Sequence, residues 1–306
     1  MNYYKLIAFI VLGVLSLTAV NYQCSAEVRI VPDEYATIEE AVIDSGDGDE
    51  IFVKAGLYQE ELELNKQITI YGEVSKEGQL LTILDGRNTF PIITLNVPKC
   101  NVRDLIFQRG GEASPQAAIF INSSANRVDH CIFRTSFHGV YINSTESNLI
   151  DDSVFYHNRE SDIAFNHHSR RNHIRMCEFH SGPIGVDMDD SQINRLTDNI
   201  FSTDIGILMT DSKQNRIYFN EFVCNGDDAN DDTGGNYWKE NGWKRYDASG
   251  RPFAIPGTGG DEDSNPHIAL CLEFRTIVPS GTIIVPDDFS TIQKAVNSAG
   301  FGDRVY

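Results

Sequence analysis

Asn126-Arg-Val-Asp-His-Cys-Ile-Phe133 is the stretch that decides the fold of this chain, because it recurs along the sequence. Each copy has Asn first, an apolar residue third, Cys, Ser or Asn sixth and Phe eighth, and successive copies begin 22, 24, 22 and 21 residues apart. A weaker copy, Asn101 to Phe107, precedes them. Self-similarity at a nearly fixed period of this size is typical of a solenoid. The four further copies begin at Asn148, Asn172, Asn194 and Asn215.

Each repeat contains two short apolar segments. One lies inside the eight-residue repeat motif just described, which we call the repeat phrase. A second, such as Ala118-Ile-Phe-Ile121, lies about eight residues before it. These segments are too short for helices and rich in Ile, Val and Phe, which favours β-strands. The alternation predicts that Val128, Cys131 and Phe133 point inward.

A single repeat cannot bury its apolar side alone, whereas stacked repeats about 4.8 Å apart bury a continuous core. The pattern therefore predicts an all-β fold, a single-stranded parallel β-helix. Asn at a fixed turn position has two expected roles. It tolerates the left-handed backbone conformation, and its amide can bond the same amide in the coils above and below.

Composition limits the cellular setting and the partners. Residues 1–26 carry Lys5, an apolar stretch and a small residue at the end, which predicts a secretory signal peptide. Its removal takes away one positive charge, so the net charge changes from -19 to -20. Such a charge excludes nucleic acid as a partner and argues against tight polyanion binding without a bridging cation. We expect a secreted, extracellular or periplasmic monomer with no membrane segment after cleavage.

Five cysteines remain after cleavage. Cys131 and Cys177 occupy the same place in the phrase two coils apart, about 9–10 Å, which exceeds disulfide reach. We interpret both as small buried apolar residues. The pairing that remains open is Cys224 with Cys271.

The ends of the repeat region carry related segments. In residues 30–42, Thr37 can cap a short helix that covers the open end of the solenoid. Residues 284–296 repeat this segment at an offset of 254. We therefore expect residues 27–281 to form the β-helix domain, with a covering loop at 224–266, and residues 282–306 to be the truncated start of a second copy.

Three motifs carry a family resemblance. Val31-Pro-Asp33 with Thr37-Ile38, the Asn-x-Ile-x-x-Asn-x-Phe coils, and Gly235-Asn-Tyr-Trp238 with Ile255-Pro-Gly257 resemble pectin-lyase-like secreted proteins. The group that they resemble most comprises the copper-accessory (NosD-like) periplasmic β-helix proteins of nitrous-oxide reductase maturation and related surface proteins. The resemblance covers residues 28–266 and implies a right-handed helix. It does not fix an activity, because this fold hosts enzymes and binding proteins alike.

One column of residues offers acid–base chemistry. Asp129, Asp151 and Arg175 occupy the same position in three successive coils. A polysaccharide lyase needs a base beside a carboxylate that a cation has neutralised, so these are the candidate catalytic residues. The alternative interpretation is an exposed ladder of ion pairs along the helix.

Two groups of residues are candidate metal ligands. An acidic cluster could hold Ca²⁺ through carboxylate and carbonyl oxygens. His167, His168 and His173 could supply ligands for copper or zinc. The acidic cluster comprises Asp227, Asp228, Asp231 and Asp232.

The leading hypothesis is a secreted β-helix protein that binds an extracellular or cell-surface polysaccharide without catalysis. A lyase or hydrolase acting on a polyuronate is one alternative. A periplasmic copper-accessory protein is the other, and it would take copper as its ligand.

Overall fold

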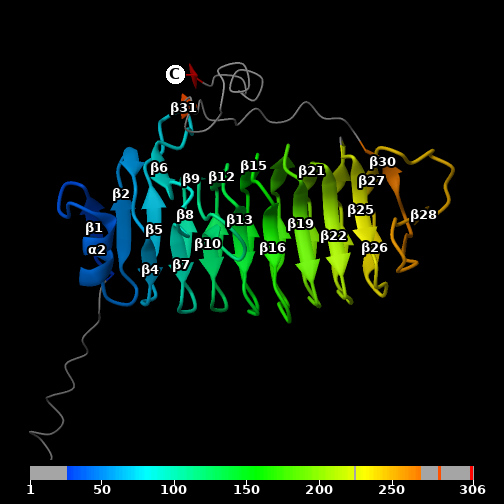
Figure 1. Cartoon of the computed structure of the whole chain (residues 1–306), viewed down its shortest axis with the longest axis horizontal. Helices are drawn as coiled ribbons and strands as arrows, with labels where there is room; N and C mark the ends of the chain where they lie inside the picture. The colour runs from blue at the N-terminus through cyan, green and yellow to red at the C-terminus, as the bar shows by residue number, and fades with distance from the viewer. Residues whose placement is uncertain (1–25, 224, 270–281, 284–303, 306) are drawn as a thin grey trace, which may run out of the picture.

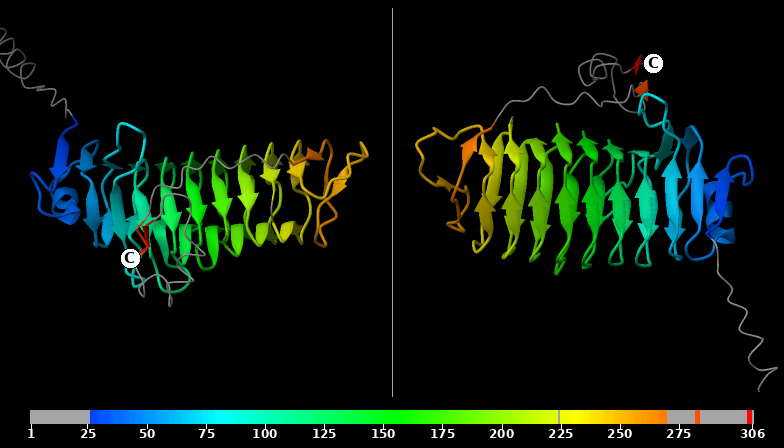
Figure 2. Two further views of the ribbon diagram at one scale, coloured as in Figure 1. Left: turned by 90° about the horizontal axis from the view of Figure 1, so that it is seen from above. Right: turned by 180° about the vertical axis from the view of Figure 1, so that it is seen from behind.

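The computed structural model describes residues 26–223, 225–269, 282–283 and 304–305. The chain winds into a long stack of coils, with the N-terminal coils at one end and the C-terminal coils at the other (Figure 1). In a typical coil the chain passes through three sheets, which we name A, B and C, of 12, 10 and 8 strands, and all their strands except β28 pair in parallel. Figure 2 shows the same stack from above and from behind.

Sheet A carries the first strand of each repeat phrase. In its three-residue strands the central residue points into the core, and the residues on either side of it point outward. In spatial order its strands are β1 (Val28–Val31), β2 (Glu50–Val53), β5 (Thr69–Gly72), β8 (Asn101–Arg103), β11 (Arg127–Asp129), β14 (Leu149–Asp151), β17 (His173–Arg175), β20 (Arg195–Thr197), β23 (Arg216–Tyr218), β26 (Tyr237–Lys239), β29 (Glu262–Asp263) and β28 (Phe253–Ala254).

Sheet B carries the end of the phrase, including the phenylalanines. Its strands are β3 (Gly56–Tyr58), β6 (Thr82–Asp85), β9 (Ile106–Gln108), β12 (Ile132–Arg134), β15 (Val154–Tyr156), β18 (Glu178–His180), β21 (Ile200–Ser202), β24 (Glu221–Phe222), β27 (Gly242–Trp243) and β30 (His267–Ile268).

Sheet C carries the second apolar segment of each repeat. Its strands are β4 (Leu62–Leu64), β7 (Ile93–Leu95), β10 (Ala117–Ile121), β13 (His138–Ile142), β16 (Ser161–Phe165), β19 (Ile184–Asp189), β22 (Ile205–Thr210) and β25 (Asp227–Asp231). The predicted right-handed parallel β-helix is confirmed. Crossovers between parallel strands are right-handed because that hand suits the strand twist.

The helix α2 (Ile38–Asp44) covers the N-terminal end of the stack, as predicted. Thr37 is its N-cap, and its side chain accepts a hydrogen bond from the backbone N–H of Glu40. Ile38 and Ala41 are fully buried against the first coil. The helix thereby hides the backbone groups and apolar surface that an open solenoid end would expose.

Stacked aromatic rings fill the core beside sheet B. Phe179 lies between Phe155 and Phe201, with ring centroids 5.1 and 4.7 Å away. All three side chains are fully buried. The predicted burial of Val128, Cys131 and Phe133 is also confirmed.

A ladder of buried asparagines runs along the corner before sheet A. Asn172 Nδ2 donates to Asn194 Oδ1 at 3.2 Å, and the backbone N–H of Asn148 donates to Asn172 Oδ1 at 2.9 Å. The predicted amide ladder is therefore confirmed. The second expected role of Asn is wrong, because the left-handed residue is the one before it. Among the described residues these are Ala125, Ser147, Arg171, Ile193 and Gln214.

The weak copy at Asn101 is out of register with the other copies. Asn101 pairs with Arg127, the residue after the ladder position. Cys100 takes the ladder position instead, and its backbone N–H donates to Asn126 Oδ1 at 2.9 Å. Phe107 does align with Phe133, so this coil joins the aromatic column although it contributes no Asn to the ladder.

The expected covering loop at 224–266 contains a further coil, which corrects the prediction. Strands β25, β26 and β27 pair in register with β22, β23 and β24. Asn236 and Asn241 continue two asparagine ladders, and the Trp243 ring stacks on Phe222 at 4.4 Å. Antiparallel strands β28 and β29 then close this end. Trp has replaced Phe in this copy of the phrase, which concealed the repeat.

Two short strands lie within the expected second copy. They are β31 (Thr282–Ile283) and β32 (Arg304–Val305), which pair in parallel. Their partners are 22 residues apart, as in the pairing of Val28 with Glu50 in the first coil. The existence of a second domain stays a prediction. The Cys224–Cys271 pairing lies outside the described residues.

Candidate functional site

The outer face of sheet A brings the predicted acid–base column together. Asp129 pairs with Asp151, and Asp151 pairs with Arg175, on the adjacent strands β11, β14 and β17. The side chains point outward because each follows an inward apolar residue by one position. The structure thus places all three predicted residues in one row across three coils.

Two arginines enclose the carboxylate of Asp151. Arg175 Nε and Nη2 donate to its two oxygens at 3.0 and 2.7 Å. Arg127 Nη2 donates to Asp151 at 3.0 Å and lies 3.1 Å from an oxygen of Asp129. The Asp151 side chain is 2% exposed. The expectation of an exposed ladder therefore needs correction, because the two guanidinium groups cover its central carboxylate.

This arrangement opposes general-base catalysis by Arg175. The hydrogen bonds to Asp151 raise the pKa of the Arg175 guanidinium further above its already high range. A base that abstracts a proton must be unprotonated at the working pH. Arg175 therefore serves as a fixed cation in this row.

Two histidines flank the row with opposite protonation tendencies. A hydrogen bond to Asp104 raises the pKa of His130, whose Nδ1 lies 2.7 Å from the carboxylate. Burial, followed by the positive charges of Arg195 and Arg175, lowers the pKa of His173. His173 Nε2 lies 2.9 Å from the Thr197 hydroxyl. His173 is thus held neutral at pH 7 among fixed cations.

Toward the C-terminal end of the face, sequence reasoning missed two arginines. Arg195 pairs directly with Arg216 on the neighbouring strand, and both side chains are exposed. Within the described residues, neither side chain forms a hydrogen bond or an ion pair. The sequence did contain a signal for this pair. Each arginine directly follows an Asn of the repeat phrase, so the two occupy the same position in successive coils.

Tyrosines accompany this pair. Tyr237 continues the column of Arg195 and Arg216 and is 55% exposed. Tyr218 lies on the neighbouring strand β23 and pairs with Lys239 of β26. Lys239 in turn forms an ion pair with Glu240 at 3.2 Å. Trp238 and Trp243 are both buried in the core, so neither is exposed for contact with a sugar.

The predicted calcium ligands point in different directions. Asp227 and Asp232 are exposed, whereas Asp228 and Asp231 are buried. Asp231 accepts hydrogen bonds from the backbone N–H groups of Thr233 and Gly234 and from Asn236 Nδ2, so it caps a turn. Its oxygens are therefore occupied by amide donors.

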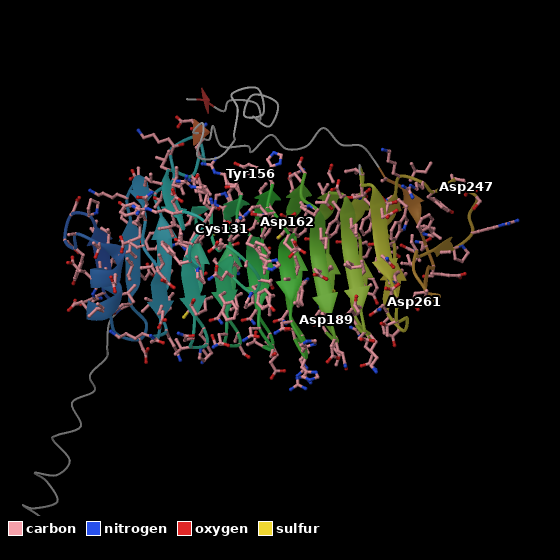
Figure 3. All side chains as sticks on the ribbon, in the orientation of Figure 1. Cys131, Tyr156, Asp162, Asp189, Asp247 and Asp261 are labelled. Carbon is pink, nitrogen blue, oxygen red and sulfur yellow. The ribbon has the colours of Figure 1, made fainter. Side chains whose placement is uncertain are left out.

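The histidine candidates separate as well. His167 and His168 lie at the corner after sheet C, where their Nδ1 atoms are 3.4 Å from Asp189 and 3.1 Å from Asp190. Asp189 lies at the edge of the stack (Figure 3). His173 lies on sheet A. Across the described residues, no group of three or more His, Cys, Asp or Glu could hold a metal ion.

No helix within the described part of the chain is long and apolar enough to cross a membrane. The sequence has no match among curated proteins. Three solved structures have similar folds at 12% sequence identity each. The pectin methylesterase of Aspergillus niger has a TM-score of 0.43, covering 83% of this chain and 94% of that one.

The rice weevil pectin methylesterase has a TM-score of 0.32 and covers 62% of this chain and 76% of that one. A family 6 alginate lyase has a TM-score of 0.29, with 92% and 64% covered. A family model matches residues 45–257, which include most of the coils. The chain therefore belongs to the family described as periplasmic copper-binding protein (NosD).

Proposed function

We propose that this protein is a periplasmic or secreted β-helix that binds a polysaccharide on the outer face of sheet A without cleaving it. The observation that carries the proposal is the enclosed carboxylate of Asp151. Its hydrogen bonds from Arg127 and Arg175 leave neither Asp151 nor Arg175 available as an acid or base. The face therefore offers fixed charges and hydrogen-bond donors, which suit binding.

The shape and chemistry of the face support a carbohydrate ligand. Parallel strands at constant spacing make a long, regular platform on which a linear chain can lie. Tyr237 is exposed on it, and tyrosine presents an apolar ring with a polar tip, a combination that fits a sugar. Arginine and histidine donors beside the tyrosine can reach hydroxyl or carboxylate oxygens.

Copper binding by this chain is suggested by the family description alone. Cys131 and Cys177 are buried, and burial raises the pKa of both thiols, so they are protonated and inaccessible. His167 and His168 face carboxylates but assemble no set of three donors within the described residues. The described residues do not fit a copper site, and we do not propose copper as a ligand.

A glycan array with the purified protein, with and without Ca²⁺, tests the proposal. We expect retention on at least one polysaccharide class. In parallel, the absorbance of unsaturated product is followed on pectate and alginate at alkaline pH with Ca²⁺, and we expect no increase. Turnover that disappears in Arg175→Ala would show that the protein is a lyase. An array without any bound glycan would also contradict the proposal.

A further inference from the structure

We infer that Arg195 and Arg216 form a binding site for the carboxylate groups of an acidic polysaccharide. This inference rests on the proposed function and names the ligand class of the same face. The two arginines lie directly opposite each other on β20 and β23, about 4.8 Å apart by the strand spacing. Both side chains are exposed, and neither has a hydrogen-bond or ion-pair partner in the described part of the chain.

The pairing of like charges is the first argument. Like charges directly opposite each other on neighbouring strands destabilise a sheet. The chain has 44 acidic and 25 basic residues, so carboxylates to neutralise the pair are abundant in its composition. The fold nevertheless places the two arginines opposite each other, and no carboxylate of the described residues forms an ion pair with either. An anion that bridges them would remove the repulsion and form charge-assisted hydrogen bonds.

The other arginines of the same face provide the comparison. Arg127 and Arg175 both reach Asp151, and Arg103 pairs with Asp104. Arginines on the N-terminal part of the face are therefore neutralised from within the protein. Arg195 and Arg216 differ from them in being left open to an external anion.

The surroundings of the pair favour a sugar chain over a small anion. The column continues from His173 through Arg195 and Arg216 to the exposed Tyr237. The groups thus follow one another along the helix axis at the spacing of the coils. A linear chain with a carboxylate on successive sugars can contact both arginines and place a ring on the tyrosine. Arginine suits this role because its planar fork binds carboxylates through two hydrogen bonds.

The net charge of -19 argued against tight binding of a polyanion without a bridging cation, whereas this arginine pair would bind the anion directly. Isothermal titration of the full chain with polygalacturonate oligomers in EDTA measures this metal-independent binding. We expect binding that weakens as salt is raised, because exposed charges are screened. Arg195→Gln and Arg216→Gln should each weaken binding roughly tenfold, and the double variant should weaken it further.

The matched control is Arg251→Gln, an exposed arginine outside this face, which should leave the affinity unchanged. Thermal melting separates lost binding from lost folding. The double variant should melt no lower than the parent, because it removes a like-charge contact. Equal affinity of parent and double variant, or binding that requires Ca²⁺, would overturn the inference.

The two proposals fail differently. If the parent protein binds neutral glucan oligomers but not polygalacturonate, the inference about the arginine pair is wrong and the proposed function stands. If no oligomer of either type binds, both are wrong. Retention of heparin without retention of polygalacturonate would show that the pair recognises sulfate, which also contradicts the carboxylate assignment.

Discussion

Asn241 donates its side-chain amide to Asp263 over 2.9 Å, so one asparagine ladder ends on a carboxylate. Asp263 is fully buried and also accepts hydrogen bonds from the backbone N–H of Asn241 and from Trp243 Nε1, at 3.0 and 3.1 Å. The neighbouring ladder ends in the same way, because the backbone N–H of Asn236 donates to Asp261. A carboxylate accepts without donating, which suits the last described coil, where Asp263 stands in place of a further Asn of the ladder.

The first prediction concerns this end of the stack. Asp263→Ala should lower the free energy of unfolding by about 3 kcal/mol, because several buried donors lose their acceptor. Chemical denaturation monitored by circular dichroism measures the change. Asp247→Ala, at an exposed loop position, is the matched control and should cost less than about 1 kcal/mol. Equal losses for the two variants would show that the ladder end does not stabilise the fold.

The second prediction concerns the aromatic column. Phe179→Ala should destabilise the protein by about 3–5 kcal/mol, because it opens a cavity between the Phe155 and Phe201 rings. Phe219→Ala removes the same side chain from a position that is 51% exposed and should cost less than about 1 kcal/mol. A loss below about 1 kcal/mol for Phe179→Ala would mean that the column is not the core.

The third prediction concerns the pH dependence of stability. Asp162 is fully buried, and within the described residues its carboxylate accepts one hydrogen bond, from Asn158. Burial raises the pKa of this carboxyl well above 3.8. As the pH rises above 3.8, the unfolded chain releases this proton before the folded chain does. Stability should therefore fall with rising pH until the raised pKa of the folded state is passed.

Asp162→Asn removes this proton release from both states. The variant should be more stable than the parent at pH 7, and the difference should disappear near pH 3, where the carboxyl is protonated in both states. Urea melts across this pH range provide the measurement. Asp232→Asn, at an exposed position, is the control. A stability difference that does not change with pH would contradict the argument.

The fourth prediction concerns the row on sheet A. Asp151→Asn should destabilise the protein by about 1–3 kcal/mol, because Arg127 and Arg175 would lose their shared carboxylate; their own exposure limits the effect. Asp129→Asn should cost less than about 1 kcal/mol, because this carboxylate is 24% exposed and its one ion pair in the described part of the chain is with Arg127. If Asp151→Asn were as stable as the parent, the row would be an ordinary surface ion pair.

The sequence predicted the coil, its core and the row of candidate residues. Repeat spacing translates directly into stacking, because residues at equal positions of a phrase must lie above one another. The Asn ladder, the Phe column and the register of Asp129, Asp151 and Arg175 followed from this rule. The rule failed at residues 224–244, where Trp243 replaces Phe and glycines and aspartates dilute the pattern.

The sequence by itself therefore determined which residues share a column and face. The tertiary structure decided what each one contacts. Burial of Asp151 depends on guanidinium groups from the coils on either side. Arg195 and Arg216 stay unpaired because no described residue places a carboxylate against them. A periodic sequence pattern specifies which position of the coil each residue occupies and therefore which residues lie above one another along the helix axis. Exposure and charge pairing depend on side-chain directions between coils, and these are set by packing.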